Sequence, residues 1–72
     1  MKKLKSHHES AAEYFEKAAE HHRAAAEHAE DGEHEAATQQ AHIAYGYALL
    51  GHEQAASATK QYVELETETD KE

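Results

Sequence analysis

Histidine is the residue type whose number and spacing suggest chemistry in this chain. Eight of the 72 residues are histidine. His8 and His22 are two heptads apart, and a neighbouring series with a period of seven residues consists of His7, Tyr14, His21 and His28. A neutral imidazole is a common ligand for zinc, copper and nickel, and histidine changes charge near neutral pH. We therefore consider two kinds of chemistry, namely metal binding and a response to pH.

A metal site requires that histidines distant in sequence come together. Asp31 and Gly32 are the strong turn signal of the chain, and folding back there places residues at one level when their numbers sum to about 64. His22 and His42 meet this condition, and a twofold axis would double the pair. We predict that His22 and His42, with His21 or Glu20 as further ligands, bind a transition metal such as zinc, copper or nickel across a helical bundle.

The alternative is a structural role for the same histidines. The chain contains neither the Glu-x-x-His spacing of di-iron bundles nor a His-x-x-x-His pair on one helix face. In this interpretation the imidazoles form hydrogen bonds with glutamate, tyrosine or water. The chain is then a structural or protein-interaction module that holds no metal.

Two apolar series with alternating steps of four and three residues predict two long helices with one buried face each. The first series is Leu4, His8, Ala11, Phe15, Ala18, His22, Ala25 and Ala29. The second is Ala37, Ala41, Ala44, Ala48, Gly51, Ala55, Ala58, Tyr62 and Leu65. His8 and His22 thus take buried positions, where charging an imidazole would cost hydration. A pH-responsive oligomer is therefore one form of the alternative without metal.

The expected organisation is a single helical-hairpin domain over residues 1–64. Its first helix covers about 6–30, with Ser6 as N-cap and Glu9 as capping-box partner. A turn over 31–33 follows, in which Gly32 takes the left-handed conformation that ends helices. The second helix covers about 33–64, and residues 65–72 form an acidic frayed tail. Because the turn is short, the two helices must lie antiparallel.

The second helix is apolar on nearly every side between His42 and His52. Its large apolar side chains are Ile43, Tyr47 and Leu50 on one flank and Tyr45 and Leu49 on the other. One partner helix does not cover both flanks, so we predict a homodimer, an all-α four-helix bundle in which glycine and alanine allow close approach. The competing interpretation breaks the second helix at Gly51 and gives a tetratricopeptide-like helical repeat.

Composition excludes several other classes. A formal net charge of −8 argues against nucleic-acid binding, which requires a basic surface. The longest apolar run, 43–50, is far shorter than the roughly 20 residues that cross a membrane. Cysteine is absent, so no disulfide forms. We find no nucleophile with a matching base and no phosphate-binding loop, so we expect neither an enzyme nor catalytic residues, and we expect a cytoplasmic location.

Three stretches carry a resemblance to known proteins. They are residues 21–28 (HHRAAAEH), 31–37 (DGEHEAA) and 41–46 (AHIAYG). Together they resemble a group of small histidine-rich bacterial helical-hairpin proteins without an assigned function. The resemblance covers about half of the chain, depends mainly on composition, and carries no site residue over.

Overall fold

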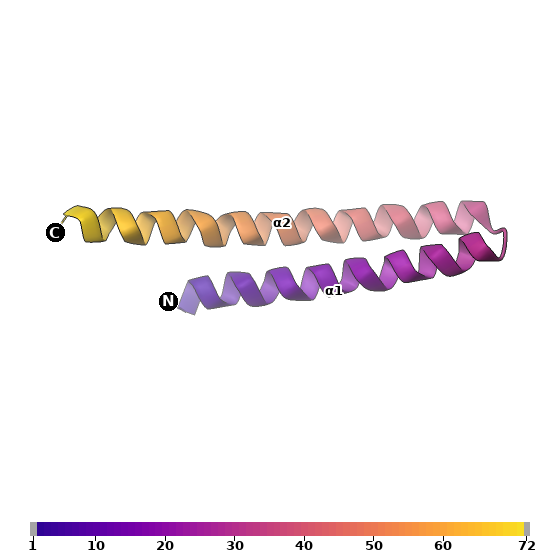
Figure 1. Ribbon diagram of the computed structural model, residues 1–72, viewed down its shortest axis with the longest axis horizontal. Helices are drawn as coiled ribbons and strands as arrows, with labels where there is room; N and C mark the ends of the chain where they lie inside the picture. Colours follow the sequence, from indigo (N-terminus) through magenta and orange to yellow (C-terminus); the bar gives the residue numbers. More distant parts are fainter. Residues whose placement is uncertain (1, 72) are drawn as a thin grey trace.

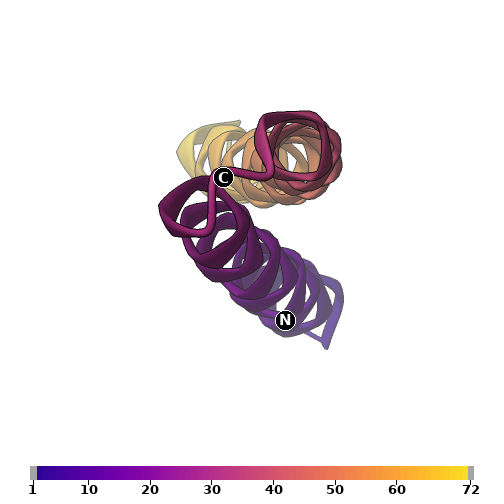
Figure 2. The same cartoon turned by 90° about the vertical axis from the view of Figure 1, so that its right-hand side faces the viewer.

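The chain forms a two-helix hairpin. The computed structural model describes residues 2–71, with side chains for residues 3–66. Helix α1 spans Lys2–Glu30 and α2 spans His34–Lys71, and residues 2–71 contain no strand. The two helices run antiparallel and side by side (Figure 1), and the end-on view shows that they cross at an angle (Figure 2). The resulting rod measures 61 × 15 × 11 Å. The predicted all-α hairpin is confirmed.

The helices are longer than expected at both chain ends. Helix α1 begins at Lys2 rather than near Ser6, and α2 continues to Lys71 rather than ending near residue 64. Neither extension contains proline or glycine, so nothing in the backbone stops the helix there. The predicted acidic tail of residues 65–72 is therefore helical through Lys71, while Glu72 lies outside the described residues.

The turn is a Schellman motif. Gly32 has φ +78°, the left-handed conformation expected from the sequence. The N–H of Glu33 donates to the carbonyl of His28 at 2.8 Å, and the N–H of Gly32 donates to that of Ala29 at 3.1 Å. These bonds satisfy carbonyls at the end of α1, and α2 starts immediately afterwards. The antiparallel arrangement follows from this short, fully bonded connection.

Helix α2 passes through Gly51 without a break. Gly51 is buried, and a Cβ atom built there would lie 2.9 Å from two ring atoms of Phe15. The glycine thus allows the Phe15 ring to lie directly on the α2 backbone. The helix break that the tetratricopeptide-like interpretation requires is absent from residues 34–71, so that interpretation is wrong.

Small residues fill the centre of the helix interface. Among the described side chains, the buried hydrophobic ones are all alanine, namely Ala11, Ala18, Ala44 and Ala58. Together with Gly51 they recur at intervals of seven residues on each helix, and we call these five residues the small-residue stripe. All five belong to the predicted buried faces, so this part of the prediction is confirmed. Because their side chains are short, the helix backbones approach each other closely.

Candidate functional site

Polar and aromatic contacts link the two helices every seven residues beside the small-residue stripe. The contacts are His7 with Gln54, Tyr14 with Tyr47, and His21 with Gln40, and we call them the polar ladder. His7 Nδ1 lies 2.8 Å from Gln54 Oε1, and His21 Nδ1 lies 2.6 Å from Gln40 Oε1. Because a carboxamide oxygen only accepts, each imidazole donates from Nδ1. The neutral ring then keeps its lone pair on Nε2.

Tyr47 is the aromatic centre of the polar ladder. Its ring stacks on Tyr14, with ring centroids 6.4 Å apart, and on His21, with centroids 5.5 Å apart and the ring planes inclined by 14°. At the turn, His28 Nδ1 lies 3.0 Å from Glu33 Oε1 and continues the same series. The residue numbers of all four pairs, including His28 with Glu33, sum to 61 instead of the expected 64.

The structure corrects the predicted buried face of the first helix. His8 and His22 are exposed, whereas His7 and His21 are half-buried in the interface. Ala11 and Ala18 of the predicted face stay buried, but the positions beside them in the interface are those of His7, Tyr14 and His21, one residue earlier than predicted. The reason is that the glutamine acceptors and the Tyr47 ring of α2 lie opposite this series. The pH-responsive alternative loses the two buried histidines on which it depended. A signal for the correct series was present, since Gln40, Tyr47, Gln54 and Gln61 also recur every seven residues.

The residues predicted to bind a metal lie in different surroundings. His22 and His42 are exposed, and His42 precedes fully buried Ala44 by two residues, which places it on the side of α2 away from α1. His21 belongs to the polar ladder, and a Glu20 carboxylate oxygen lies 4.0 Å from Lys17 Nζ. In the part of the chain that the structure describes, no three histidine, aspartate or glutamate side chains are placed to hold a metal ion. The set His22, His42, His21 and Glu20 therefore stays a prediction.

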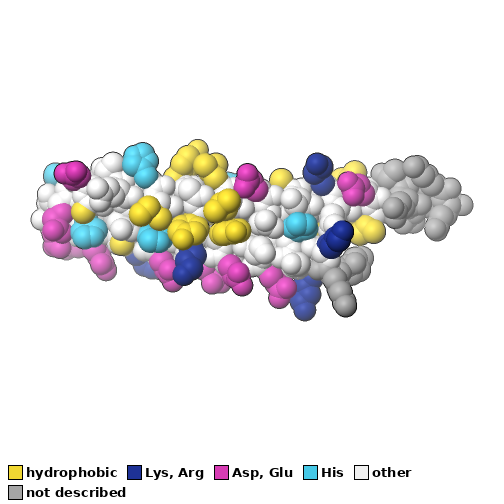
Figure 3. Space-filling view, turned by 180° about the vertical axis from the view of Figure 1, so that it is seen from behind, with side chains coloured by type: hydrophobic (Ala, Val, Ile, Leu, Met, Phe, Trp, Pro, Cys, Tyr) yellow, Lys and Arg dark blue, Asp and Glu magenta, His cyan; other side chains and the backbone are white. Residues whose placement is uncertain are grey.

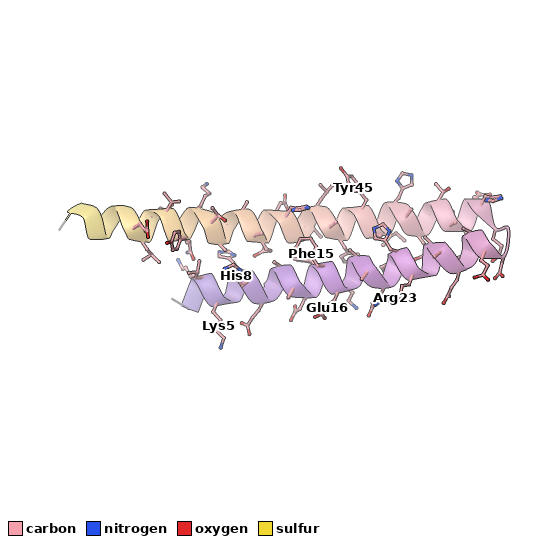
Figure 4. The ribbon with its side chains drawn as sticks, in the orientation of Figure 1. Lys5, His8, Phe15, Glu16, Arg23 and Tyr45 are labelled. Atoms are coloured by element: carbon pink, nitrogen blue, oxygen red, sulfur yellow. The ribbon has the colours of Figure 1, made fainter. Side chains whose placement is uncertain are left out.

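The opposite edge of the interface holds an aromatic contact. Phe15 is 39% exposed and packs edge-on against His52, with ring centroids 5.3 Å apart. Figure 4 shows Phe15 between the helices, whereas Tyr45 points away from α1. The Phe15 ring thus covers Gly51 of α2 on this edge.

Large apolar side chains gather on the outside of the hairpin over the middle of α2. Ile43, Leu49 and Leu50 are 43%, 48% and 40% exposed. Ile43, Gly46, Tyr47 and Leu50 line a shallow open depression of about 270 Å³, and hydrophobic side chains cluster near the middle of the face shown in Figure 3. Residues 36–52 contain no Asp, Glu, Lys or Arg. We call Ile43, Gly46, Tyr47 and Leu50 the α2 patch.

Neither α1 nor α2 contains, within its described residues, a stretch long and apolar enough to span a lipid bilayer. No protein-family model matches the chain, and neither a curated protein nor a solved structure does. The resemblance to small histidine-rich bacterial hairpin proteins therefore stays a prediction.

Proposed function

We propose that this chain is a self-associating helical module, in which two copies form a four-helix bundle with α2 at its centre. The supporting observation is an inverted distribution of side-chain size. The buried hydrophobic side chains among those described are alanines, whereas Ile43, Leu49 and Leu50 are at least 40% exposed. A single hairpin therefore leaves most of its large apolar surface in water, and burial of part of that surface drives association.

The total surface area supports the same proposal. The accessible surface is 5614 Å², whereas a globular monomer of 8.0 kDa exposes about 4,450 Å². Part of the excess of about 1,200 Å² belongs to the end of α2 that extends beyond the start of α1 (Figure 1), and the remainder is available to an interface, to which each partner contributes roughly 800 Å² in a standard complex. A dimer would bring the exposed area of each copy close to that of a compact protein. The proposed role is binding and assembly, and it assigns no reaction to the chain.

The mass in solution tests this function. Sedimentation equilibrium and light scattering on the untagged protein at micromolar concentration should give twice the monomer mass of 8.0 kDa. The melting temperature should also rise with protein concentration, because dissociation and unfolding are then linked. A monomeric mass throughout the micromolar range, with a melting temperature independent of concentration, would contradict the proposal.

Transition-metal binding in the assembled form is a second candidate function. The observation that favours it is the hydrogen bond from His21 Nδ1 to Gln40, because metal-binding histidines commonly have one ring nitrogen oriented in this way. The ligands would be exposed His22 and His42, together with His21 or Glu20, contributed by two copies. Zinc, copper and nickel suit these donors.

Melting curves with zinc and with EDTA test the second candidate. Zinc should raise the melting temperature of the wild type and of His34→Asn, an exposed control, but not that of His22→Asn. Elemental analysis of untagged protein purified without a metal column should then find the metal. Identical curves for the wild type with zinc and with EDTA would contradict metal binding while leaving dimerisation intact.

A further inference from the structure

Gly46 has no structural use within the hairpin. Apart from its chain neighbours and the backbone of its own helix turn, a Cβ atom built at Gly46 would meet no described atom within 4 Å, whereas one at Gly51 would collide with Phe15. Both glycines lie inside α2 and reduce its intrinsic helix stability relative to alanine. Gly51 allows the Phe15 ring to pack, but nothing in one chain makes the same use of Gly46. A contact from outside the hairpin would supply such a use.

The surroundings of Gly46 form a continuous face. Ile43 and Leu50 lie three and four residues from Gly46 along the helix, Tyr47 directly follows Gly46, and all four residues line the same depression. Tyr47 is already held by stacking on Tyr14 and His21, so its ring is fixed before any partner arrives. A fixed apolar depression with a glycine in it is suited to a second helix, because the absent side chain allows the backbones to approach.

We propose that α2 of a second copy packs antiparallel across the α2 patch, with the Gly46–Tyr47 pairs of the two copies at the crossing point. This inference rests on the proposed self-association and specifies the surface that carries it. Ile43 and Leu50 are equally far in sequence from the Gly46–Tyr47 pair. In an antiparallel contact each Ile43 therefore lies opposite Leu50 of the second copy, as a self-complementary twofold interface requires.

Charge favours the same segment. The chain carries a net charge of −8, so most of its surface repels a second copy. Residues 36–52 lack Asp, Glu, Lys and Arg, and the α2 patch lies inside that segment. Two copies meeting through the patch thus avoid bringing carboxylates together at the contact.

The opposite flank of α2 is less suited to a close contact. It carries Tyr45 and Leu49, neither of which lines the depression around Gly46. Tyr45 is 63% exposed and has a hydroxyl group that water satisfies. Gly51 faces α1 and is covered by the Phe15 ring, so Gly46, which lines the depression of the α2 patch, is the glycine of this helix that stays open to a partner backbone.

Two adjacent leucines provide a matched experiment. Leu50 lies in the α2 patch and Leu49 on the other flank, and their exposures are similar at 40% and 48%. In sedimentation equilibrium on the full chain, Leu50→Gln should weaken dimerisation by about tenfold or more. Leu49→Gln should change the dissociation constant by less than about twofold.

Gly46→Ala is the second variant, and it separates an effect on dimerisation from an effect on folding. Alanine favours the helix, so circular dichroism should show helicity at least equal to that of the wild type. The added methyl group should nevertheless weaken dimerisation by about tenfold, because it separates the backbones at the crossing point.

Dimerisation of Gly46→Ala at wild-type strength, or an effect of Leu49→Gln equal to or larger than that of Leu50→Gln, would overturn the patch while leaving self-association in place. A wild-type chain that is monomeric at every concentration would instead overturn the proposed function, and the patch with it. The two failures are therefore distinguishable.

Discussion

The small-residue stripe and the polar ladder lie side by side in one interface but determine different properties of it. The stripe consists of alanines and Gly51, so shifting one helix by seven residues again places small residues against small residues. The ladder residues differ from one level to the next, so the same shift would place His21 opposite Tyr47 and remove its bond to Gln40. The stripe thus sets the distance between the helices, and the ladder sets their register.

Enlarging a residue of the stripe should have the largest effect. Ala44 is 0% exposed, so the Ala44→Leu side chain has no space unless the helices separate. We expect the free energy of unfolding to fall by about 2–3 kcal/mol. Urea denaturation followed by circular dichroism measures this loss. The matched control is Ala41→Leu, an exposed site on the same helix, which should change stability by less than about 0.5 kcal/mol. Equal losses at the two sites would show that the stripe does not set the distance.

Gly51→Ala should have the next largest effect, because its Cβ atom would lie 2.9 Å from the Phe15 ring. Phe15 is partly exposed, so its ring can move outward, and we expect a net loss of about 1–2 kcal/mol. In a Phe15→Ala background the same substitution should instead stabilise the chain, by about 1 kcal/mol, because only the helix preference of alanine remains. Thermal denaturation of the wild type, the two single variants and the double variant tests this change of sign. A loss in both backgrounds would exclude the ring as the cause.

A double-mutant cycle on His21 and Gln40 tests the ladder. Their hydrogen bond is 2.6 Å long and half-buried, so we expect a coupling energy of about 0.5–1.5 kcal/mol from His21→Ala, Gln40→Ala and the double variant. The control cycle replaces His21 with exposed His22 and should give no coupling. Equal coupling energies in the two cycles would contradict the assignment of His21, rather than His22, to the polar ladder.

The sequence predicts the elements of the fold because heptads and turn glycines are local signals. The hairpin, the left-handed Gly32 and all five residues of the small-residue stripe are predicted correctly. The choice between two adjacent series is a different problem. His7, Tyr14 and His21 have nearly the same pattern as His8, Phe15 and His22, one position later. The two series differ by about 100° around the helix, and only the residues of α2 decide between them.

The candidate site shows the same limit. Counting apolar residues leaves Gln40 and Gln54 out, although they hold His21 and His7 in the interface. The expectation that residues at one level have numbers summing to about 64 is too high by three. His28 already pairs with Glu33 at the turn, with a sum of 61, and every later pair along the helices keeps this sum. Such an offset depends on the detailed turn geometry, which the pattern of residue types does not specify. His22 and His42 therefore share a level in the sequence-based estimate but not in the structure.

The smallest effect should come from the ion pair between Lys17 and Glu20. Their charged atoms are 4.0 Å apart, and the side chains are 58% and 63% exposed, so water and salt screen the attraction. The pair also lies within α1 and so carries no information about the register of α2. We expect Lys17→Ala to change the free energy of unfolding by less than about 0.5 kcal/mol at low salt, and by less still at high salt. Urea denaturation at two salt concentrations measures both values. If Lys17→Ala lowered the free energy of unfolding as much as His21→Ala does, exposed charges would also help to fix the register. The polar ladder would then not be the sole determinant of the register.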